Sequence, residues 1–390
     1  MSSASNNHSL HFKTLPPLSL YVHIPWCVRK CPYCDFNSHT ATKVLPEAEY
    51  IDYLIDDLEA DLPLAQGRPL QSIFFGGGTP SLFSGNSIAR LLERIEQRIP
   101  FTNDIEITLE ANPGTTEQQK FHDFYRAGIN RLSIGIQSFN EEHLQILGRI
   151  HNASEALNAV KAARTAGFNN FNLDLMHGLP NQTVAQAKAD LQQAIALEPS
   201  HLSWYQLTLE TNTAFFNNPP TLPGEDLLAD IQSAGETLLQ ENNFQQYEVS
   251  AYSLNDQQSK HNKNYWQYGD YIGIGAGAHG KNTDLAQQTI SRNWKTRLPR
   301  DYMDTNKPFR AGNKIIPTAE LPFEFMMNVL RLKEGFEKNL FEQRCGQNFE
   351  AIQNKITSLI QQNFLEDRMG NVKTTPLGQR YLNTVIEEFL

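Results

Sequence analysis

Three of the chain's four cysteines, Cys27, Cys31 and Cys34, stand close together in the spacing C-x3-C-x2-C. Thiolates grouped in this way are soft ligands of the kind that iron–sulfur clusters and zinc take. A structural zinc site closes its tetrahedron with four protein ligands, whereas three thiolates suit an iron–sulfur cube that keeps one iron open for a substrate. The pattern therefore favours a cluster. The zinc alternative needs one more ligand nearby, and the candidates are His23, His39 and Asp35.

The fourth cysteine, Cys345, lies far along the sequence from the other three. An isolated cysteine is more often a small buried hydrophobe than a ligand. We interpret it as a buried thiol without a chemical role.

Polar or glycine residues stand at the C-terminal end of each of six short β-rich runs: the cysteine loop, the segment 76–79, Glu110, Gln137, Asp174 and Thr208. Any one of them could be a turn residue or a helix cap. If the six runs are parallel strands, however, their carboxyl ends meet at one rim, and in an α/β barrel that rim carries the active site. The spacing therefore predicts one site built from all six.

The elements that must position these residues alternate between strand and helix. Strands are predicted at 18–24, 71–75, 105–110, 131–136, 171–176 and 202–207, and helices with apolar spacing near 3.6 at 50–62, 88–99, 153–166 and 185–197. Such alternation gives parallel pairing with helical crossovers. We predict an α/β fold with a partial (β/α)6 barrel, open because only six units are clear.

The rest of the chain has a different pattern. Strand and loop character is mixed from 212 to 288. After Pro317 the sequence predicts helices at 323–332 and 349–361, a hairpin at 364–376 and a terminal helix at 377–389, which together suggest a winged-helix-like domain. We therefore divide the chain into a tail (1–17), a barrel core (18–225), a barrel extension (226–316) and a C-terminal domain (317–390).

Composition excludes several classes of function. The formal net charge is -10, so no basic field for nucleic acid exists, and we expect the C-terminal domain to pack on the barrel or on a protein partner. The chain lacks the apolar run of about 18 residues that a membrane span needs, and its first residues lack a signal-peptide core. We expect a cytoplasmic protein, in which clustered cysteines are metal ligands rather than disulfides.

The motifs also resemble a known superfamily. C-x3-C-x2-C with an aromatic residue, Tyr33, before the last cysteine, followed by "GGGTP" at 76–80, is similar to the radical S-adenosylmethionine superfamily. The resemblance implies that the three cysteines hold a [4Fe-4S] cluster. It also implies that the amino and carboxylate groups of S-adenosylmethionine chelate the open iron, and that the protein's share is to hold and orient this cofactor.

Within that superfamily the chain resembles the porphyrin-related branch through most of its length, in "SLYVHIPWC", "LEANPG", "NRLSIGIQSF", "LGRIH" and "NLDLMHGLP" among others. The resemblance implies that tyrosines lie near the cofactor, that the glycine run bonds the methionyl amine, that an arginine pairs with its carboxylate, and that carboxylates and amides read the amine, ribose and adenine. The residues implied are Tyr21, Tyr33, Gly77, Gly78, Thr79, Glu110, Gln137, Arg149, Asp174 and Thr208.

Two sister families of this branch differ at two places. Oxygen-independent coproporphyrinogen dehydrogenases carry a fourth cysteine two positions after the third, where this chain has Phe36. HemW-type haem chaperones lack that cysteine and carry the signature H-N-x-x-Y-W, which His261, Asn262, Tyr265 and Trp266 match. The resemblance therefore implies a chaperone that delivers haem to acceptor proteins, respiratory ones among them. A radical enzyme of the dehydrogenase type is the alternative.

The signature also suggests a haem site. Haem needs an axial ligand and a flat apolar wall, which His261 with Tyr265 and Trp266 could supply. On the residues alone, a histidine capping a loop beside core aromatics explains the pattern equally well. His279, at the end of "GIGAGAHG", is a second candidate ligand. Membrane contact would be peripheral, and the exposed edges of an open barrel would allow a homodimer.

Overall fold

The computed structural model describes residues 10–41, 44–255 and 257–390. Six neighbouring parallel strands form its centre, in the order in which they occur along the chain. They are β1 (Leu18–Ile24), β4 (Leu70–Gly77), β5 (Phe101–Ala111), β6 (Arg131–Gln137), β7 (Phe171–His177) and β8 (His201–Gln206). All six predicted strands are present, so the predicted partial barrel is confirmed.

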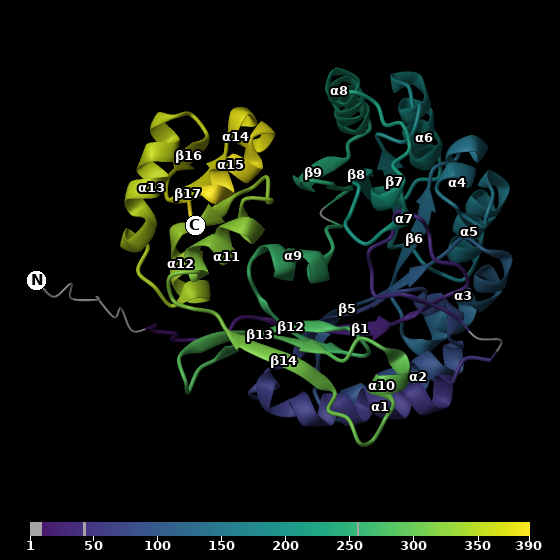
Figure 1. The fold of residues 1–390 in the computed structure, drawn as a ribbon, viewed down its shortest axis with the longest axis horizontal. Helices are drawn as coiled ribbons and strands as arrows, with labels where there is room; N and C mark the ends of the chain where they lie inside the picture. Colours follow the sequence, from purple (N-terminus) through teal and green to yellow (C-terminus); the bar gives the residue numbers. More distant parts are fainter. Residues whose placement is uncertain (1–9, 42–43, 256) are drawn as a thin grey trace, which may run out of the picture.

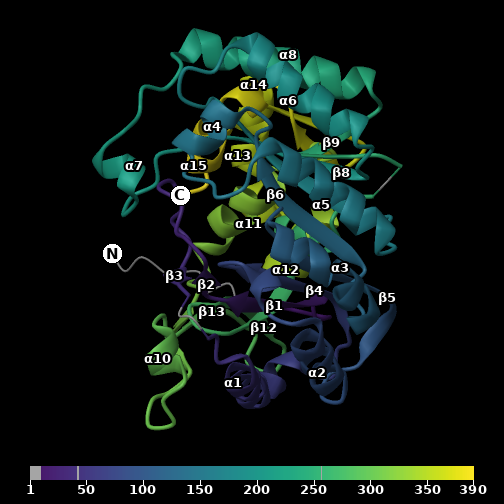
Figure 2. The same cartoon turned by 90° about the vertical axis from the view of Figure 1, so that its right-hand side faces the viewer.

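Helices cover the outside of this sheet (Figure 2). They are α1 (Glu47–Asp61), α2 (Gly85–Glu96), α3 (Thr115–Ala127), α4 (Glu141–Ile146), α5 (Ala153–Thr165), α6 (Val184–Ala196) and α8 (Glu225–Glu241). The short α7 (Ala214–Asn217) stands apart from the sheet (Figure 2), and the 3-10 turns η1 (Leu62–Ala65) and η2 (Pro80–Leu82) follow α1 and β4 along the chain. Polar caps set several of their starts: Asn152 and Thr183 begin α5 and α6 with capping boxes, and Ser84 caps α2. Helix α8 lies in a region where we expected mixed loop and strand.

Alternation along β1 separates the core from the barrel interior. Leu20 and Val22 belong to the main hydrophobic core together with residues of α1 such as Leu54. The intervening side chains point the other way, where the hydroxyl oxygen of Ser19 lies 2.7 Å from that of Ser72 on β4. The interior of the barrel is therefore polar, and the apolar core lies between sheet and helices.

The sheet continues beyond the barrel on both sides and reaches twelve strands. Strand β11 (Asp270–Ile274) pairs parallel with β1, and β12 (His279–Asp284), β13 (Thr289–Lys295) and β14 (Arg310–Ile315) follow antiparallel. On the other side β10 (Ala251–Ser253) and β9 (Gln245–Glu248) follow β8. Helix α10 (Pro299–Tyr302) lies between β13 and β14 in sequence. Because β9 and β14 do not pair, the barrel is open.

The C-terminal region forms a second, smaller unit (yellow in Figure 1). It contains α11 (Leu321–Val329), β15 (Phe336–Glu337), α12 (Lys338–Cys345), α13 (Glu350–Gln361), β16 (Leu365–Arg368), β17 (Asn371–Thr374), α14 (Pro376–Arg380) and α15 (Leu382–Glu387). Its sheet has the order β15-β17-β16, so the winged-helix-like arrangement is confirmed. The expected single terminal helix is instead two, because Tyr381 leaves the helical conformation with ψ 36°.

This unit shares its core with earlier parts of the chain. Phe325 and Phe341 pack in one cluster with Phe12 and Tyr268, and the fully buried Cys345 lies in the same cluster, as we expected. Helix α9 (Lys260–Trp266) lies between this unit and the barrel (Figure 1). No helix in the described part of the chain is long and apolar enough to cross a membrane.

Candidate cluster and cofactor site

The three clustered cysteines lie on a loop that the rest of the barrel holds in place. Cys27 ends the short strand β2 (Trp26–Cys27), which pairs with β3 (His39–Thr40). Backbone bonds join the loop to its surroundings, from Thr79 N to Trp26 O at 2.7 Å and from Phe215 N to Pro32 O at 2.9 Å. The positions of the thiols are therefore set by β1, β4 and α7 together.

All three thiols are free and half-buried. Burial raises the pKa of Cys27 and of Cys34, and the neighbouring cysteines raise the pKa of Cys34 further. Among the described residues, no three histidine, cysteine or carboxylate side chains converge closely enough to hold one metal ion. The thiolates of a cubane each bind a different iron and so stand further apart than the ligands of a single ion. The donor set therefore fits an iron–sulfur cube better than zinc.

The zinc alternative also loses one of its ligands. The ring nitrogen Nε2 of His23 lies 2.9 Å from the carbonyl of Asn37, which can only accept, so Nε2 carries the proton. Nδ1 therefore accepts from the hydroxyl of Tyr21 at 3.1 Å. Burial lowers the pKa of His23 to about 4. Both nitrogens of this neutral ring are engaged, so His23 orients Tyr21 rather than binding a metal.

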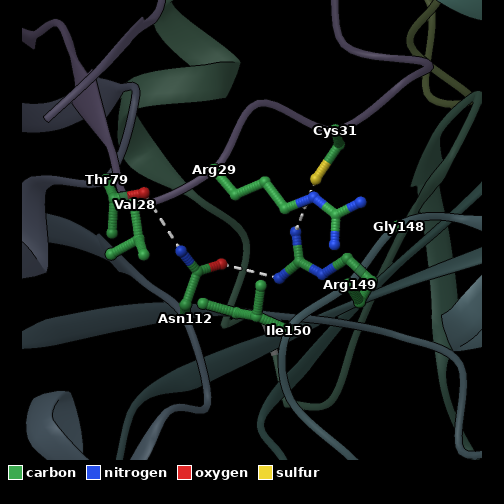
Figure 3. A pocket seen from close by; sticks show the side chains of 8 residues that line it. All are labelled: Val28, Arg29, Cys31, Thr79, Asn112, Gly148, Arg149 and Ile150. Carbon is green, nitrogen blue, oxygen red and sulfur yellow. Dashed lines mark hydrogen bonds between the residues drawn. The ribbon is translucent and has the colours of Figure 1, made fainter.

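A chain of polar contacts links two of the cysteines beside a small cavity of about 20 Å³ (Figure 3). The Thr79 hydroxyl donates to Cys27 Sγ at 3.5 Å and accepts from Asn112 Nδ2 at 3.0 Å. Asn112 Oδ1 accepts from Arg149 at 2.6 Å, and Arg149 also donates to Cys31 Sγ at 3.7 Å and to the carbonyl of Gly135 at 2.7 Å. A cavity of this size holds about one water.

Arg149 is positioned to read an anion but is engaged with its neighbours here. Its Nε is buried and has no hydrogen-bond partner. A buried guanidinium with an unused donor suits a carboxylate, which takes two parallel hydrogen bonds. Asn112 was not among the predicted site residues, although it stands in the quoted "LEANPG" two positions after Glu110. The signal that could have found it is its place at the end of β5.

The glycine run is required by packing at two positions. Gly77 has φ 111°, and a Cβ there would lie 2.5 Å from the ring of His23. A Cβ on Gly78 would lie 2.6 Å from the carbonyl oxygen of Trp26. The backbone N–H of Gly78 is bonded to Ile24 O at 2.8 Å. The absence of side chains at Gly77 and Gly78 therefore lets the end of β4 pack against the cysteine loop. An amine bound at this place would donate hydrogen bonds to backbone carbonyls.

Two buried carboxyl groups, Glu110 and Asp174, lie close enough inside the rim to influence each other's charge. Burial, followed by the charge of Asp174, raises the pKa of Glu110 to about 8, and the N–H of Gly77 donates to its Oε2 at 3.3 Å. Burial also raises the pKa of Asp174, which accepts from Ser133 at 2.9 Å and from Asn172 at 2.8 Å. Nearby positive charge or hydroxyl donors would stabilise both groups. The two carboxyl groups are therefore suited to accept hydrogen bonds from an amine and from ribose hydroxyls.

The remaining predicted cofactor residues divide into two groups. Gln137, at the left-handed φ of 71°, accepts from Tyr205 OH at 2.7 Å, and Tyr33 packs its ring 6.4 Å from that of Phe215. These side chains lie at the rim. Thr208 follows the end of β8 and is exposed, and its hydroxyl donates a hydrogen bond to the Glu210 carboxylate at 2.8 Å. The structure therefore brings most of the set together but leaves Thr208 at its margin.

The H-N-x-x-Y-W signature forms α9, on the side of the barrel opposite the cysteine loop. His261 is 2% exposed, with its ring 5.1 Å from those of Phe74 and Tyr265. Burial lowers its pKa to about 3. Its Nδ1 lies 3.0 Å from Ser72 Oγ, and its Nε2 is buried without a partner. In this candidate haem ligand, Nε2 is therefore unengaged but enclosed.

The other two haem candidates lie apart from this ring. Trp266 ends α9, with the guanidinium of Arg331 4.4 Å from the centre of its indole. His279 is exposed at the start of β12, directly opposite the 36% exposed Trp294 of β13. Two separate places thus offer an imidazole beside aromatic rings.

Comparison with known proteins shows the family. The family described as "Radical SAM superfamily" matches residues 21–194, and the "HemN C-terminal domain" matches residues 316–381. The chain is 52% identical over 380 residues to the heme chaperone HemW of Haemophilus influenzae, which covers 96% of this chain and 98% of that protein. The chain belongs to the HemW family. This family assignment carries with it the cluster and S-adenosylmethionine that the radical S-adenosylmethionine superfamily implies.

Other relatives agree with the placement of this HemW-family chain. It is 49% identical to heme chaperone HemW of Escherichia coli, over 96% of this chain and 99% of that protein. A mitochondrial radical S-adenosyl methionine domain-containing protein of Mus musculus is 43% identical over 67% of this chain and 60% of its own length. The solved coproporphyrinogen III oxidase (HemN) of Escherichia coli superposes with a TM-score of 0.80 at 22% identity, covering 96% of this chain and 90% of that one, which shows the shared fold.

Proposed function

We propose that this protein is a haem chaperone, which binds haem and passes it to acceptor proteins. The observation that carries the proposal is similarity over almost the whole chain to proteins named heme chaperone HemW, at 52% and 49% identity. The position of the fourth thiol of the sister enzymes supports it. Phe36 stands there with its side chain 58% exposed, and a phenyl ring cannot replace a thiolate.

The cysteine face is proposed as the cofactor site. Cys27, Cys31 and Cys34 would hold the cluster, and Arg149, kept in place by Asn112, would pair with the carboxylate of S-adenosylmethionine. Glu110 and Asp174 would take its amine and ribose hydroxyls, and the carbonyls beside Gly77 and Gly78 would take the amine. When bound, cluster and cofactor supply one-electron chemistry, and the chain's own residues orient them.

For the haem iron, we propose two candidate ligands. His261 carries a free Nε2 but is enclosed, so iron could reach it only if α9 shifted away from Phe74. His279 lies opposite Trp294 and is accessible from solvent. Partial burial of its ring lowers the pKa of the imidazole, which keeps a nitrogen lone pair available near neutral pH. We propose His261 as the ligand in a loosened state of α9 and His279 as the alternative.

We also propose the setting in which the protein works. Free clustered thiols suit the reducing cytoplasm. Respiratory haem proteins are proposed among the acceptors. Among the described strands, none pairs with the outer edge of β14, and this edge would allow a homodimer. In this scheme 18–225 holds the cofactors, 226–316 the cargo, and 317–390 packs against the cargo region.

The test is anaerobic cluster reconstitution followed by haem titration and a porphyrinogen assay on one sample. The protein should bind about one haem per chain with a Soret band and pass it to an apo haem protein, and it should leave coproporphyrinogen III unconverted in the presence of S-adenosylmethionine. Stoichiometric decarboxylation would overturn the proposal in favour of the enzyme reading.

The same titration separates the two haem candidates. His261→Ala should weaken or shift the Soret band, and His279→Ala should not. The matched control is His122→Ala, because His122 is a surface histidine with a 63% exposed side chain. A shift in His279→Ala with none in His261→Ala would move the haem to the β12–β13 face.

A further inference from the structure

We propose that Asn172, His201 and Tyr247 form a hydrogen-bonded relay. The relay links the cofactor site at Asp174 to the beginning of helix α9, so that cofactor occupancy changes how firmly that end of the helix is held. The inference rests on the proposed cofactor role of Asp174. It adds three positioning residues that touch neither cluster nor cargo.

The relay begins at the Asp174 carboxylate. Asn172 Nδ2 donates to Asp174 Oδ1 at 2.8 Å and to the hydroxyl oxygen of Ser133 at 2.8 Å. Ser133 in turn donates to Asp174 Oδ2 at 2.9 Å. Both oxygens of the carboxylate are thus held by Asn172 and Ser133. A hydroxyl that bonds to Asp174 must share or displace these donors.

The next step has only one possible direction. His201 Nδ1 lies 2.7 Å from Asn172 Oδ1, which can only accept, so Nδ1 carries the proton. His201 Nε2 must then accept, and Tyr247 OH donates to it at 2.8 Å. His201 is fully buried, and burial together with the charge of Arg131 lowers its pKa well below the usual range. The imidazole therefore stays neutral in this one tautomer.

At its far end the relay reaches two other parts of the molecule. Because the Tyr247 hydroxyl donates its hydrogen to His201, its oxygen can only accept a further bond. The N–H of Ser259 donates to this oxygen at 3.3 Å. Ser259 is the N-cap of α9 and accepts from Asn262 N at 3.3 Å. The carbonyl of Tyr247 accepts from Lys333 N, of the C-terminal unit, at 3.0 Å. Tyr247 thus stands where barrel, α9 and C-terminal unit meet.

Other side chains also hold this end of α9, among them the exposed Asp104, which pairs with the ammonium of Lys260, and the buried Glu106. Glu106 accepts from Lys260 N at 3.0 Å, from His261 N at 3.1 Å and from Ser259 Oγ at 3.3 Å. This carboxylate comes from β5, the strand that also carries Glu110. The beginning of α9, including the backbone of His261, is therefore held by two buried polar side chains of the barrel, Tyr247 and Glu106.

Coupling follows because the three relay side chains are buried and are hydrogen-bonded to one another in sequence. In a buried chain of hydrogen bonds each bond polarises the next, and leaving a polar group unpaired costs free energy. A change in the hydrogen bonds of Asp174 is therefore passed on to Asn172, His201 and Tyr247. Rotation of Asn172 would leave His201 without an acceptor. Loss of that acceptor would free His201 and weaken the hold of Tyr247 on Ser259.

Hydrogen exchange of α9 tests the relay without using activity. The cluster-loaded protein is compared with and without saturating S-adenosylmethionine, and exchange is followed by mass spectrometry in the peptide 257–268. In the wild type, cofactor should change the exchange rate of this peptide by about fivefold or more, the lower end of common coupling between sites. Tyr247→Phe, which removes one oxygen and keeps the packing, should abolish the change.

One control isolates the relay. Tyr252→Phe alters a tyrosine on the adjacent strand β10 that is as buried as Tyr247, at 2% and 3% exposure, and should respond like the wild type. Saturation of every variant is verified by calorimetry.

Each outcome decides the question. A wild-type response that persists in Tyr247→Phe, or the absence of any response in the wild type, would overturn the relay. Haem titration of the same samples tests the proposed function independently of the exchange measurement. If haem fails to bind while the exchange response is present and lost in Tyr247→Phe, the proposed function falls and the relay stands.

Discussion

Asn112 joins the two sides of the cysteine loop, because its amide donates to Thr79 beside Cys27 and accepts from Arg149 beside Cys31. A side-chain amide is one of the few groups that can do both at once. Its effect on a bound carboxylate is exerted through Arg149. This makes Asn112 a positioning residue of the proposed cofactor site.

Asn112→Ala should lower the affinity for S-adenosylmethionine about tenfold, since Arg149 and Thr79 each lose a partner worth roughly 1 kcal/mol. Calorimetry on the cluster-loaded protein measures this. Asn152→Ala is the matched control, because it removes only the N-cap of α5. The control should cost about 1 kcal/mol of stability and leave the affinity unchanged. Equal affinities in Asn112→Ala and the wild type would remove Asn112 from the site.

The raised pKa of Glu110 makes stability depend on pH in a defined direction. The pKa of this carboxyl is about 8 in the folded chain, against 4.5 as the ordinary value, because burial and Asp174 oppose its ionisation. The folded state therefore holds a proton that the unfolded state has lost between these pH values. Without cofactor, the free energy of unfolding should fall as pH rises from about 4.5 to 8.

Urea denaturation at pH 5 and pH 8 measures this dependence. Glu110→Gln, which keeps the shape and cannot ionise, should be less sensitive to pH than the wild type and more stable than it at pH 8. Glu59→Gln, at a 48% exposed surface carboxylate, is the control and should behave like the wild type. A Glu110→Gln variant with the wild-type slope would show that other groups cause the dependence.

At the scale of elements, the end of β4 and the cysteine loop are one unit. The N–H groups of Gly78 and Thr79 bond to Ile24 and Trp26, and no side chain fits between them at Gly78. The strand end thereby fixes where Cys27 lies. The position of the thiols depends on a contact between elements distant in sequence.

Gly78→Ala should therefore impair cluster assembly. The new methyl would lie 2.6 Å from a backbone oxygen, so β1 and β4 must separate at their ends. Iron and sulfide content after reconstitution should fall well below that of the wild type. Gly224→Ala is the control, since a Cβ there meets nothing within 4 Å and its backbone angle is ordinary. Full iron loading in Gly78→Ala would contradict this account.

At the scale of the whole molecule, a buried ion network ties the barrel extension to the first helix. Lys295 on β13, 1% exposed, pairs with Asp57 and Asp61 of α1, and Arg310 on β14 also pairs with Asp61. These contacts hold the antiparallel strands against the barrel core. Removing one partner leaves buried charge uncompensated.

Lys295→Met should lower the free energy of unfolding by about 3–5 kcal/mol, since two carboxylates lose their buried cation. Chemical denaturation of the two forms checks it. Lys314→Met breaks an exposed pair with Glu320 and should cost at most about 1 kcal/mol. Equal losses in the two variants would mean that the buried network contributes no more than a surface pair.

Local pattern in the sequence was sufficient for much of the fold. The six barrel strands, four of their helices and the wing hairpin were predicted, because apolar periodicity and turn residues report local structure directly. Helix α8 was missed, and the terminal helix was predicted as one. The cysteine spacing alone indicated three ligands for a cluster, since all three lie in one loop.

Contacts between distant segments could be decided only by the tertiary structure. Asn112 and Arg149 are joined across two strand ends, His261 is enclosed by Phe74 from β4, and Tyr247 reaches Asp174 through β8 and β7. No periodicity records such pairings, because they depend on which strand ends become neighbours and on how deeply each side chain is buried. Residue types and spacing thus predicted the ligands of the cluster, and packing determined which histidine is enclosed and which polar groups are connected.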